Sequence, residues 1–207
     1  MIRVFFLIFE PSVAWDKIVL ARRTFGNIVG FYLVPMILLA TAAEGWGLAS
    51  WGKWQPRFQK FREFPLHDIF VFEFIQSLLL LAMVFLSALM LLKISQTFRD
   101  RRSYLDAFTT MAYGFGPMFL VRLMDAGPAI NPLTSWLIGI ALTIWILYQG
   151  IPRVMQPDPT HAFGLYLSTM VVVVLTSGTV RLFTGLYLLG EVDFHHSWLT
   201  HKFPNLF

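Results

Sequence analysis

Long apolar segments separated by short polar ones dominate the pattern along the chain. The clearest of them, residues 74–92, reads FIQSLLLLAMVFLSALMLL and is polar only at Gln76, Ser77 and Ser87. A helix of this length is about 28 Å long, which matches the hydrocarbon thickness of a bilayer. Because the segment is apolar on every side, it lacks the polar stripe of a helix at a soluble surface. The pattern therefore predicts a membrane-spanning helix.

The same pattern recurs and predicts an all-α fold, an integral membrane bundle of five transmembrane helices. The predicted spans cover residues of about 25–43, 74–92, 104–124, 133–148 and 162–190. Pro35 is expected to kink the first span, because proline removes a backbone donor from the helix. The whole chain, 1–207, is interpreted as one membrane domain that ends in an external tail, 191–207.

Two segments outside the spans have an amphipathic pattern. Residues 1–24 are predicted to form an N-terminal interfacial segment, with a helix that starts at Pro11 and carries Trp15 and Ile18 on its apolar side. The connection from Glu44 to Glu73 mixes aromatic and basic residues, as is typical of an aromatic belt at a membrane surface. We expect both segments to lie on the bilayer, and we expect no nucleic acid as a partner.

Small residues at helical spacing indicate where helices approach one another closely. Gly26 and Gly30 lie four residues apart in the first span. The fourth span has Ser135, Gly139 and Thr143 with the same spacing. Such positions let two backbones come together in a membrane. We expect each set to contact a neighbouring helix.

Composition and charge fit this class and suggest an orientation. The chain is 57% hydrophobic and 14% charged, with a formal net charge of +4. Of the 16 lysines and arginines, the side that holds the N-terminus has Arg3, Lys17, Arg22, Arg23, Lys93, Arg99, Arg101, Arg102 and Arg153. Loop cations are enriched on the cytoplasmic side of membrane proteins. We therefore expect a cytoplasmic N-terminus and an external C-terminus, in the bacterial inner (plasma) membrane.

Four short motifs occur in a fixed order along the chain. They are Phe9-x-Pro11 followed by Trp15 and Ile18; Tyr32-x-x-Pro35; Ala112-Tyr113-Gly114-x-x-Pro117; and Gly150-Ile151-Pro152-Arg153-Val154-Met155, followed by Ala162-Phe163-Gly164 and the run Val171 to Val174. With these motifs the chain resembles the Yip-type (Ypt/Rab-interacting) multi-pass membrane protein family, most closely its compact bacterial branch.

The resemblance implies five transmembrane helices, a cytoplasmic N-terminus and a short external tail. In eukaryotic members it implies a connection with membrane traffic, membrane shape and protein partners. The present chain lacks the Asp-Leu-Tyr-Gly-Pro motif of those members. The resemblance therefore implies a shape and a membrane role, and it implies no reaction.

Charged residues within or beside the spans are the candidate functional residues, because an ion in hydrocarbon is costly. Counting along the helices places five of them at one membrane depth near the external side: Arg181, Asp125, Arg122, Glu44 and Glu73. Arg181 is expected to pair with Asp125, or else with Glu44 or Glu73. This candidate intramembrane charge cluster is either a vestibule for an anion, a lipid headgroup or protons, or a structural set of ion pairs.

Metal binding and catalysis have little support in the sequence. The tail has His195, His196 and His201 near two carboxylates, but their spacing matches no zinc motif, and no metal or other cofactor is expected. The chain has no cysteine and no nucleophile, phosphate-loop or dinucleotide motif, so no catalytic residue is assigned. The protein is predicted not to be an enzyme.

Three functional interpretations remain open at this point. The first is a non-enzymatic, Yip-like scaffold that organises membrane or partner proteins, with membrane lipids and a protein partner or a second copy as its contacts. The second is a small-solute or ion transporter or channel, which the charges and the proline-bearing spans would permit. The third is an accessory subunit of a larger membrane complex.

Overall fold

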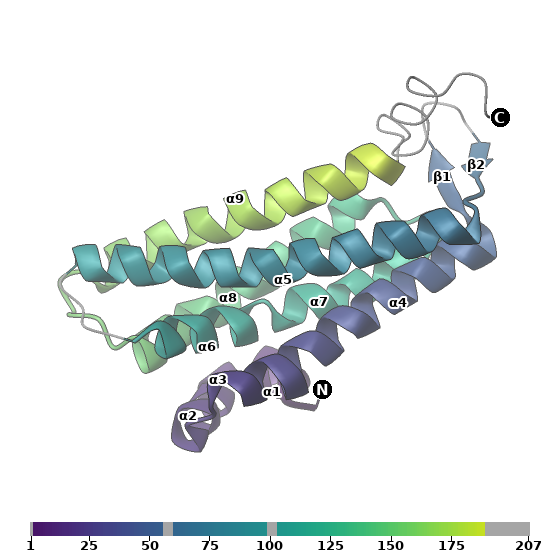
Figure 1. Ribbon diagram of the computed structural model, residues 1–207. Coiled ribbons are helices and arrows are strands. Elements are labelled where there is room, and N and C mark those ends of the chain that lie inside the picture. Colours follow the sequence, from purple (N-terminus) through teal and green to yellow (C-terminus); the bar gives the residue numbers. More distant parts are fainter. Residues whose placement is uncertain (1, 56–59, 99–102, 189–207) are drawn as a thin grey trace, which may run out of the picture.

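The computed structural model describes residues 2–55, 60–98 and 103–188, which form a helical bundle with one small hairpin (Figure 1). Its elements are α1 (Ile2–Phe9), α2 (Pro11–Ala21), α3 (Phe25–Ile28), the π-helix η1 (Val29–Leu33), α4 (Val34–Trp51), β1 (Lys53–Gln55), β2 (Lys60–Arg62), α5 (Leu66–Thr97), α6 (Tyr104–Gly114), α7 (Gly116–Val121), the 3-10 helix η2 (Arg122–Ala126), α8 (Pro132–Val154) and α9 (Ala162–Leu188). The predicted all-α character holds apart from this hairpin.

Four helices in the described part of the chain are long and apolar enough to cross a bilayer. They are Phe25–Trp51, Leu66–Thr97, Pro132–Val154 and Ala162–Leu188. The first three extend well beyond the predicted bounds, and α8 continues through Pro152 instead of ending before it. The predicted count of five is not confirmed, because the third predicted span is not one continuous helix.

The third predicted span, 104–124, is divided into α6, α7 and η2. The division falls at Phe115, between Gly114 and Gly116, and Pro117 stands in the first turn of α7. Proline has no N–H to donate back to the carbonyl of Tyr113, and its ring crowds that carbonyl. The interruption is therefore encoded locally, and it separates this segment from the other four.

Proline also shapes the first helix, although without breaking it. The helix runs from Phe25 to Trp51, and its π-helical turn, Val29–Leu33, ends two residues before Pro35. Proline has no backbone N–H, so one helical hydrogen bond is missing here, and the wider π-turn accommodates that gap. Such π-turns are a recognised cause of helix bending. The kink expected at Pro35 thus takes the form of a local change in helix type.

The connection expected between Glu44 and Glu73 is much shorter than predicted, because α4 continues to Trp51 and α5 begins at Leu66. Between them the described residues form two short antiparallel strands, with Trp54 opposite Phe61. Gly52 ends α4 with a φ of +65°, and a side chain there would collide with the Arg62 carbonyl. Glu44 and Glu73 therefore lie inside helices, and the interpretation of this whole segment as a surface loop was wrong.

The bundle core lies where α5 packs against α4, α6 and α9, and where α8 packs against α7 and α9. The N-terminal helices α1 and α2 cover one end of α7 and α8 (Figure 1). Trp15 and Ile18 of α2 are buried, at 0% and 5% exposure, so their side of the helix packs into the bundle. The predicted interfacial placement of residues 1–24 is not confirmed.

Candidate functional site

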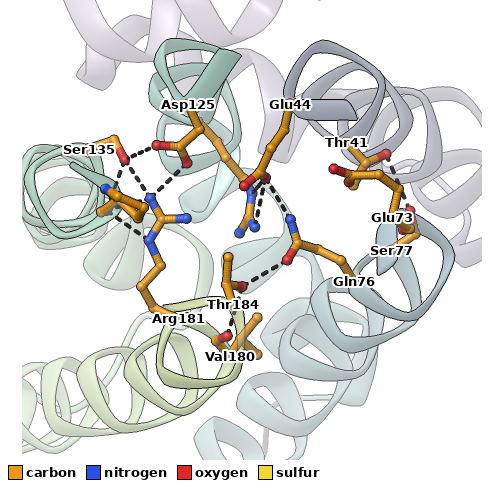
Figure 2. Close-up of polar contacts among 12 residues, drawn as sticks. Thr41, Glu44, Glu73, Gln76, Ser77, Asp125, Ser135, Val180, Arg181 and Thr184 are labelled. Carbon is orange, nitrogen blue, oxygen red and sulfur yellow. Dashed lines mark hydrogen bonds and ion pairs between the residues drawn. The ribbon is translucent and has the colours of Figure 1, made fainter. Parts of the chain in front are cut away.

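The first part of the charge cluster is a buried ion pair between α9 and η2. One guanidinium nitrogen of Arg181, Nη2, lies 2.7 Å from Oδ2 of Asp125, and the two side chains are 5% and 0% exposed. Arg181 also donates to Ser135 Oγ at 2.5 Å and, through Nε at 2.8 Å, to the Pro132 carbonyl. Ser135 in turn donates to the other Asp125 oxygen at 2.5 Å. Figure 2 shows these groups converging from three elements.

A second buried ion pair joins η2 to α4. Arg122 donates from Nε and from Nη2 to Oε2 of Glu44, each at 3.1 Å. The same oxygen accepts a hydrogen bond of 2.6 Å from the side-chain amide of Gln76 on α5. The Gln76 carbonyl accepts from Thr184 on α9 at 2.8 Å. One chain of polar contacts therefore links four elements across the bundle (Figure 2).

Lys53, on strand β1, closes the cluster at the hairpin end of the bundle. Its ammonium donates to the carbonyls of Asp125 at 2.8 Å and Gly127 at 3.1 Å, and the residue is 4% exposed. Burial lowers the pKa of Lys53 from its ordinary value, while the carboxylates of Asp125 and Glu44 act in the opposite direction. The lysine thus anchors the hairpin to the loop that follows η2.

Glu73 on α5 is the exception within the cluster. Both of its carboxylate oxygens are buried and have no hydrogen-bond partner among the described residues, and the same holds for Oε1 of Glu44. Its side chain packs over Gly45, where an added Cβ would lie 3.1 Å from the Glu73 Cγ. The nearby hydroxyl of Ser77 donates to the Glu73 backbone carbonyl at 2.8 Å and so does not serve the carboxylate.

The formal charges of the cluster balance. Three basic side chains, Lys53, Arg122 and Arg181, stand against three acidic ones, Glu44, Glu73 and Asp125. In a membrane, ions persist inside a protein when they pair with one another. The six charges come from α4, β1, α5, η2 and α9, and the two ion pairs, Arg122 with Glu44 and Arg181 with Asp125, each join two of these elements and so stabilise one arrangement of the helices.

The space within the cluster is small. A cavity of about 20 Å³ lies beside Arg181, Asp125 and Ser135. That volume accommodates about one water molecule. Over residues 2–55, 60–98 and 103–188, no group of three or more histidines and carboxylates is placed to hold a metal ion. A larger cavity, of about 290 Å³, lies at the hairpin end of the cluster, where Lys53, Pro132 and Arg181 contribute to its wall.

The structure brings all five candidate charged residues into this cluster. Arg122 pairs with Glu44, although it stands one helical turn from Asp125. Sequence reasoning assigned other roles to three further members: Gln76 was one polar residue of an apolar span, Lys53 part of the aromatic belt, and Ser135 part of a packing seam. The one useful signal was Gln76, since an amide in an otherwise apolar span needs a partner.

The motif residues form a second cluster, around the Trp15 indole, where α2 packs on α8. Trp15 donates through Nε1 to the Ile146 carbonyl at 3.1 Å and meets Tyr113 edge-on, with ring centroids 6.5 Å apart. A side chain at Gly150 would collide with the indole. Tyr113 also stacks near Tyr32, with centroids 4.2 Å apart. This second cluster is aromatic packing.

The remaining motif residues act on the backbone. Pro11 and Pro117 stand in the first turns of α2 and α7, while Pro35 follows the π-turn. A side chain at Gly114 would collide with Leu147 of α8. Pro152 lies inside α8, one turn from its end. Pro11 and Pro117 thus mark the starts of helices, and Gly114 allows α6 and α8 to approach each other closely.

The small-residue spacings gave two different outcomes. Gly139 lies against α7, where an added Cβ would be 3.2 Å from the Met118 Cα, and Ser135 and Thr143 are buried beside it. The close contact expected of this seam is confirmed. At Gly26 and Gly30 an added Cβ would meet nothing within 4 Å, so no described part of this chain uses that spacing. The tail histidines, His195, His196 and His201, lie outside the described residues.

Several apolar helices around a buried, charge-balanced polar core define an integral membrane protein with multiple spans. Many large side chains on the outside of the bundle are apolar and exposed, among them Phe31 at 78% and Phe163 at 73%. In water such a surface would aggregate, whereas lipid covers it at no cost.

The family follows from the comparison with known proteins. The Yip1 domain matches residues 5–180, which is most of the chain, and the protein therefore belongs to the Yip1 family. The resemblance seen in the motifs is confirmed. Neither the comparison with curated proteins nor that with solved structures found a match.

Proposed function

We propose that this protein is a non-enzymatic organiser of the membrane, which binds a transmembrane helix of a partner protein or of a second copy through the face of Gly26 and Gly30. The observation that carries the proposal is that this face is open. Gly26 and Gly30 are one helical turn apart, and a Cβ on either would meet nothing within 4 Å. A glycine pair of this spacing on a lipid-facing helix lets another helix approach closely.

The interior of the bundle supports a binding role over transport or catalysis. Arg181 and Arg122 both have carboxylate partners, and the cavity beside them measures about 20 Å³. A larger cavity, of about 290 Å³, lies beside Lys53 and Arg181 at the hairpin end of the cluster. Because both buried arginines are engaged by carboxylates, we infer that the surface of the protein makes the functional contacts.

The proposal is tested by blocking the glycine face. Gly26→Leu and Gly30→Leu add bulk on the outer side of the first helix, and leucine favours a helix more than glycine does, so folding is preserved. Ala82→Leu, on the exposed side of α5, adds comparable bulk elsewhere and serves as the control. The measurement is chemical cross-linking in native membranes, followed by size analysis in mild detergent.

The expected result is that both glycine variants lose a cross-linked dimer or partner complex that wild type and Ala82→Leu retain. A single stoichiometric partner would identify the protein as an accessory subunit. If the glycine variants retain every complex, this face does not bind a helix. Solute flux in reconstituted vesicles that Arg181→Ala abolishes would contradict the proposal and favour a transporter.

We further infer that the broken segment α6–α7–η2 is a fifth crossing. At one end Phe25 contacts Phe108, with ring centroids 4.6 Å apart; at the other, Gly47 abuts the Ala126 carbonyl. From Phe25 to Gly47 the first helix rises about 33 Å, a bilayer's thickness, and the segment follows it over that length. Irregular backbone at membrane depth is tolerated where protein covers it, and residues 107 and 108 and 110–119 are buried.

Five crossings place the two ends of the chain on opposite sides. The enrichment of arginine and lysine near the N-terminal side supports a cytoplasmic N-terminus and an external tail. The corresponding location is the bacterial inner membrane.

A further inference from the structure

A basic cavity lies at the end of the bundle opposite the charge cluster. Its volume is about 420 Å³, and its walls come from the end of α2, the start of α6 and the end of α8. Three arginines line it, Arg22, Arg23 and Arg153, together with apolar side chains that include Ile18 and Leu105. It differs from the charge cluster in size and in its excess of positive charge.

The acidic groups near this cavity are already engaged. Asp106, the one carboxylate in its wall, accepts from the backbone and hydroxyl of Ser103 in a capping box. Asp16 pairs with Arg153 at 3.2 Å. Among the described residues, no carboxylate pairs with Arg22 or Arg23. Three arginines against one aspartate give the wall a formal charge of +2, and counting Asp16 leaves +1.

The backbone at this cavity is held in an unusual form. Arg22 has a φ of 38° and Gln156 a φ of 43°; they are the two non-glycine residues with positive φ in the described chain, and both line the cavity. Holding a non-glycine residue at a positive φ costs a free energy of order 1 kcal/mol, and residues in this conformation concentrate at functional sites. At Arg22 the left-handed turn ends α2 and brings two adjacent arginines to the elbow before α3.

The cavity also lies at the depth of lipid headgroups. Arg22 and Arg23 stand three and two residues before Phe25, where the first candidate span begins, and Arg153 stands in the last turn of α8. Leu20, two residues before Arg22, is 81% exposed, and Phe25, two residues after Arg23, is 40% exposed. The arginines therefore lie next to side chains that face lipid, where hydrocarbon meets water.

We propose that this cavity binds the phosphate headgroup of an anionic phospholipid. Guanidinium groups match phosphate oxygens with paired hydrogen bonds, and basic pockets between membrane helices bind anionic headgroups. The apolar walls accommodate the glycerol and the start of the acyl chains. The site is separate from the glycine face, so its test does not depend on the organising role.

The test is a lipid titration of the full chain, purified in a neutral detergent and followed by native mass spectrometry. The probes are phosphatidylglycerol, phosphatidylcholine and inorganic phosphate. The variants are Arg22→Gln/Arg23→Gln, its charge-conserving counterpart Arg22→Lys/Arg23→Lys, and the control Lys93→Gln. Lys93 is exposed near the same end of the bundle and does not line the cavity. Circular dichroism and size exclusion report the folding of each variant.

We expect phosphatidylglycerol to bind at least tenfold more tightly than phosphatidylcholine, since each arginine contributes about a factor of five. The glutamine pair is expected to remove this preference, the lysine pair to reduce it, and Lys93→Gln to preserve it. Equal binding of the two lipids overturns the proposal. It is also overturned if Lys93→Gln loses the preference as fully as the glutamine pair does, because the lipid would then be attracted by the overall positive charge and not by this cavity. Displacement of the lipid by millimolar inorganic phosphate would make the ligand a free anion and overturn the lipid assignment.

Discussion

Arg181 and Asp125 are 56 residues apart in the chain and form an ion pair of 2.7 Å that is almost completely removed from solvent. Neither charge is stable alone at this depth, because isolated ions in hydrocarbon cost several kcal/mol. The pair therefore ties α9 to the end of the broken segment, and the geometry of the bundle depends on both residues being present.

Breaking this buried pair is expected to destabilise the protein more than breaking an ion pair at the surface would. Arg181→Met strands the Asp125 carboxylate, and Asp125→Leu strands the guanidinium, each at a cost of about 3–5 kcal/mol. The double variant is expected to recover much of that loss, because it removes both members of the pair and strands neither of them. Thermal unfolding in mild detergent measures the effect as a lower Tm.

The control for this series is Asp106→Ala. Asp106 belongs to an exposed capping box at the start of α6, and its removal is expected to cost only about 1 kcal/mol. If Asp106→Ala lowers the Tm more than Asp125→Leu does, the Arg181 pair is not the stronger constraint.

Glu44 and Glu73 provide a matched comparison within the cluster. Glu44→Gln removes the carboxylate that Arg122 contacts, and the buried arginine is expected to destabilise the fold by about 3–5 kcal/mol. Glu73→Gln removes a carboxylate that accepts no hydrogen bond, so the Tm is expected to stay unchanged or to rise. Equal losses in the two variants would mean that Glu73 has a stabilising partner after all.

The Trp15 cluster predicts an intolerance at Gly150. Gly150→Ala places a methyl group against the indole, so Trp15 must move and its bond to the Ile146 carbonyl lengthens or breaks. We expect a loss of about 1–3 kcal/mol, typical of overpacking. Unfolding curves of Gly150→Ala, measured with and without Trp15→Phe, check the coupling.

The outcome of that cycle depends on the size of the ring. Phenylalanine is smaller than tryptophan, so Gly150→Ala is expected to cost less in the Trp15→Phe background. If the two losses of stability are additive, Gly150 is required by the structure of α8 itself and not by the contact between α8 and Trp15 of α2.

Five crossings predict that the two termini lie on opposite sides of the membrane. Reporter tags that are active on one side only, fused separately to each end, are expected to give opposite signals. A tag inserted in the hairpin between β1 and β2 is expected to match the C-terminal tag. If both termini report from the same side, α6–α7–η2 does not cross and the number of crossings is even.

Sequence reasoning succeeded where a single helix contains the information. The apolar length of residues 74–92 is enough to predict a span, and the seam of Gly139 is enough to predict a close contact. Counting residues along each predicted span also placed Arg181 and Asp125 at one depth, where the structure brings them together. These inferences need only helical geometry and the thickness of a bilayer.

Sequence reasoning failed where the outcome depended on packing between elements. Residues 44–51 and 66–73 were interpreted as parts of a loop because they are polar and aromatic, yet they are helical, and Glu44 pairs with Arg122 inside the bundle. Likewise, Trp15 was expected to lie on lipid and instead fills a space opposite Gly150. Neither partner is close in sequence, so no local pattern could reveal them.

The amino-acid sequence by itself determined that the chain is a helical membrane protein of the Yip type, because hydrophobic length and helix-breaking residues act locally. Tertiary structure alone decided that Arg122 pairs with Glu44, and that the Glu73 carboxylate has no hydrogen-bond partner among the described residues. It also decided that Arg22 and Arg23, just after α2, line one cavity with Arg153 of α8. The physical reason is that a buried charge is stabilised by whichever opposite charge the packed helices bring within reach, and that choice exists only after the helices have packed.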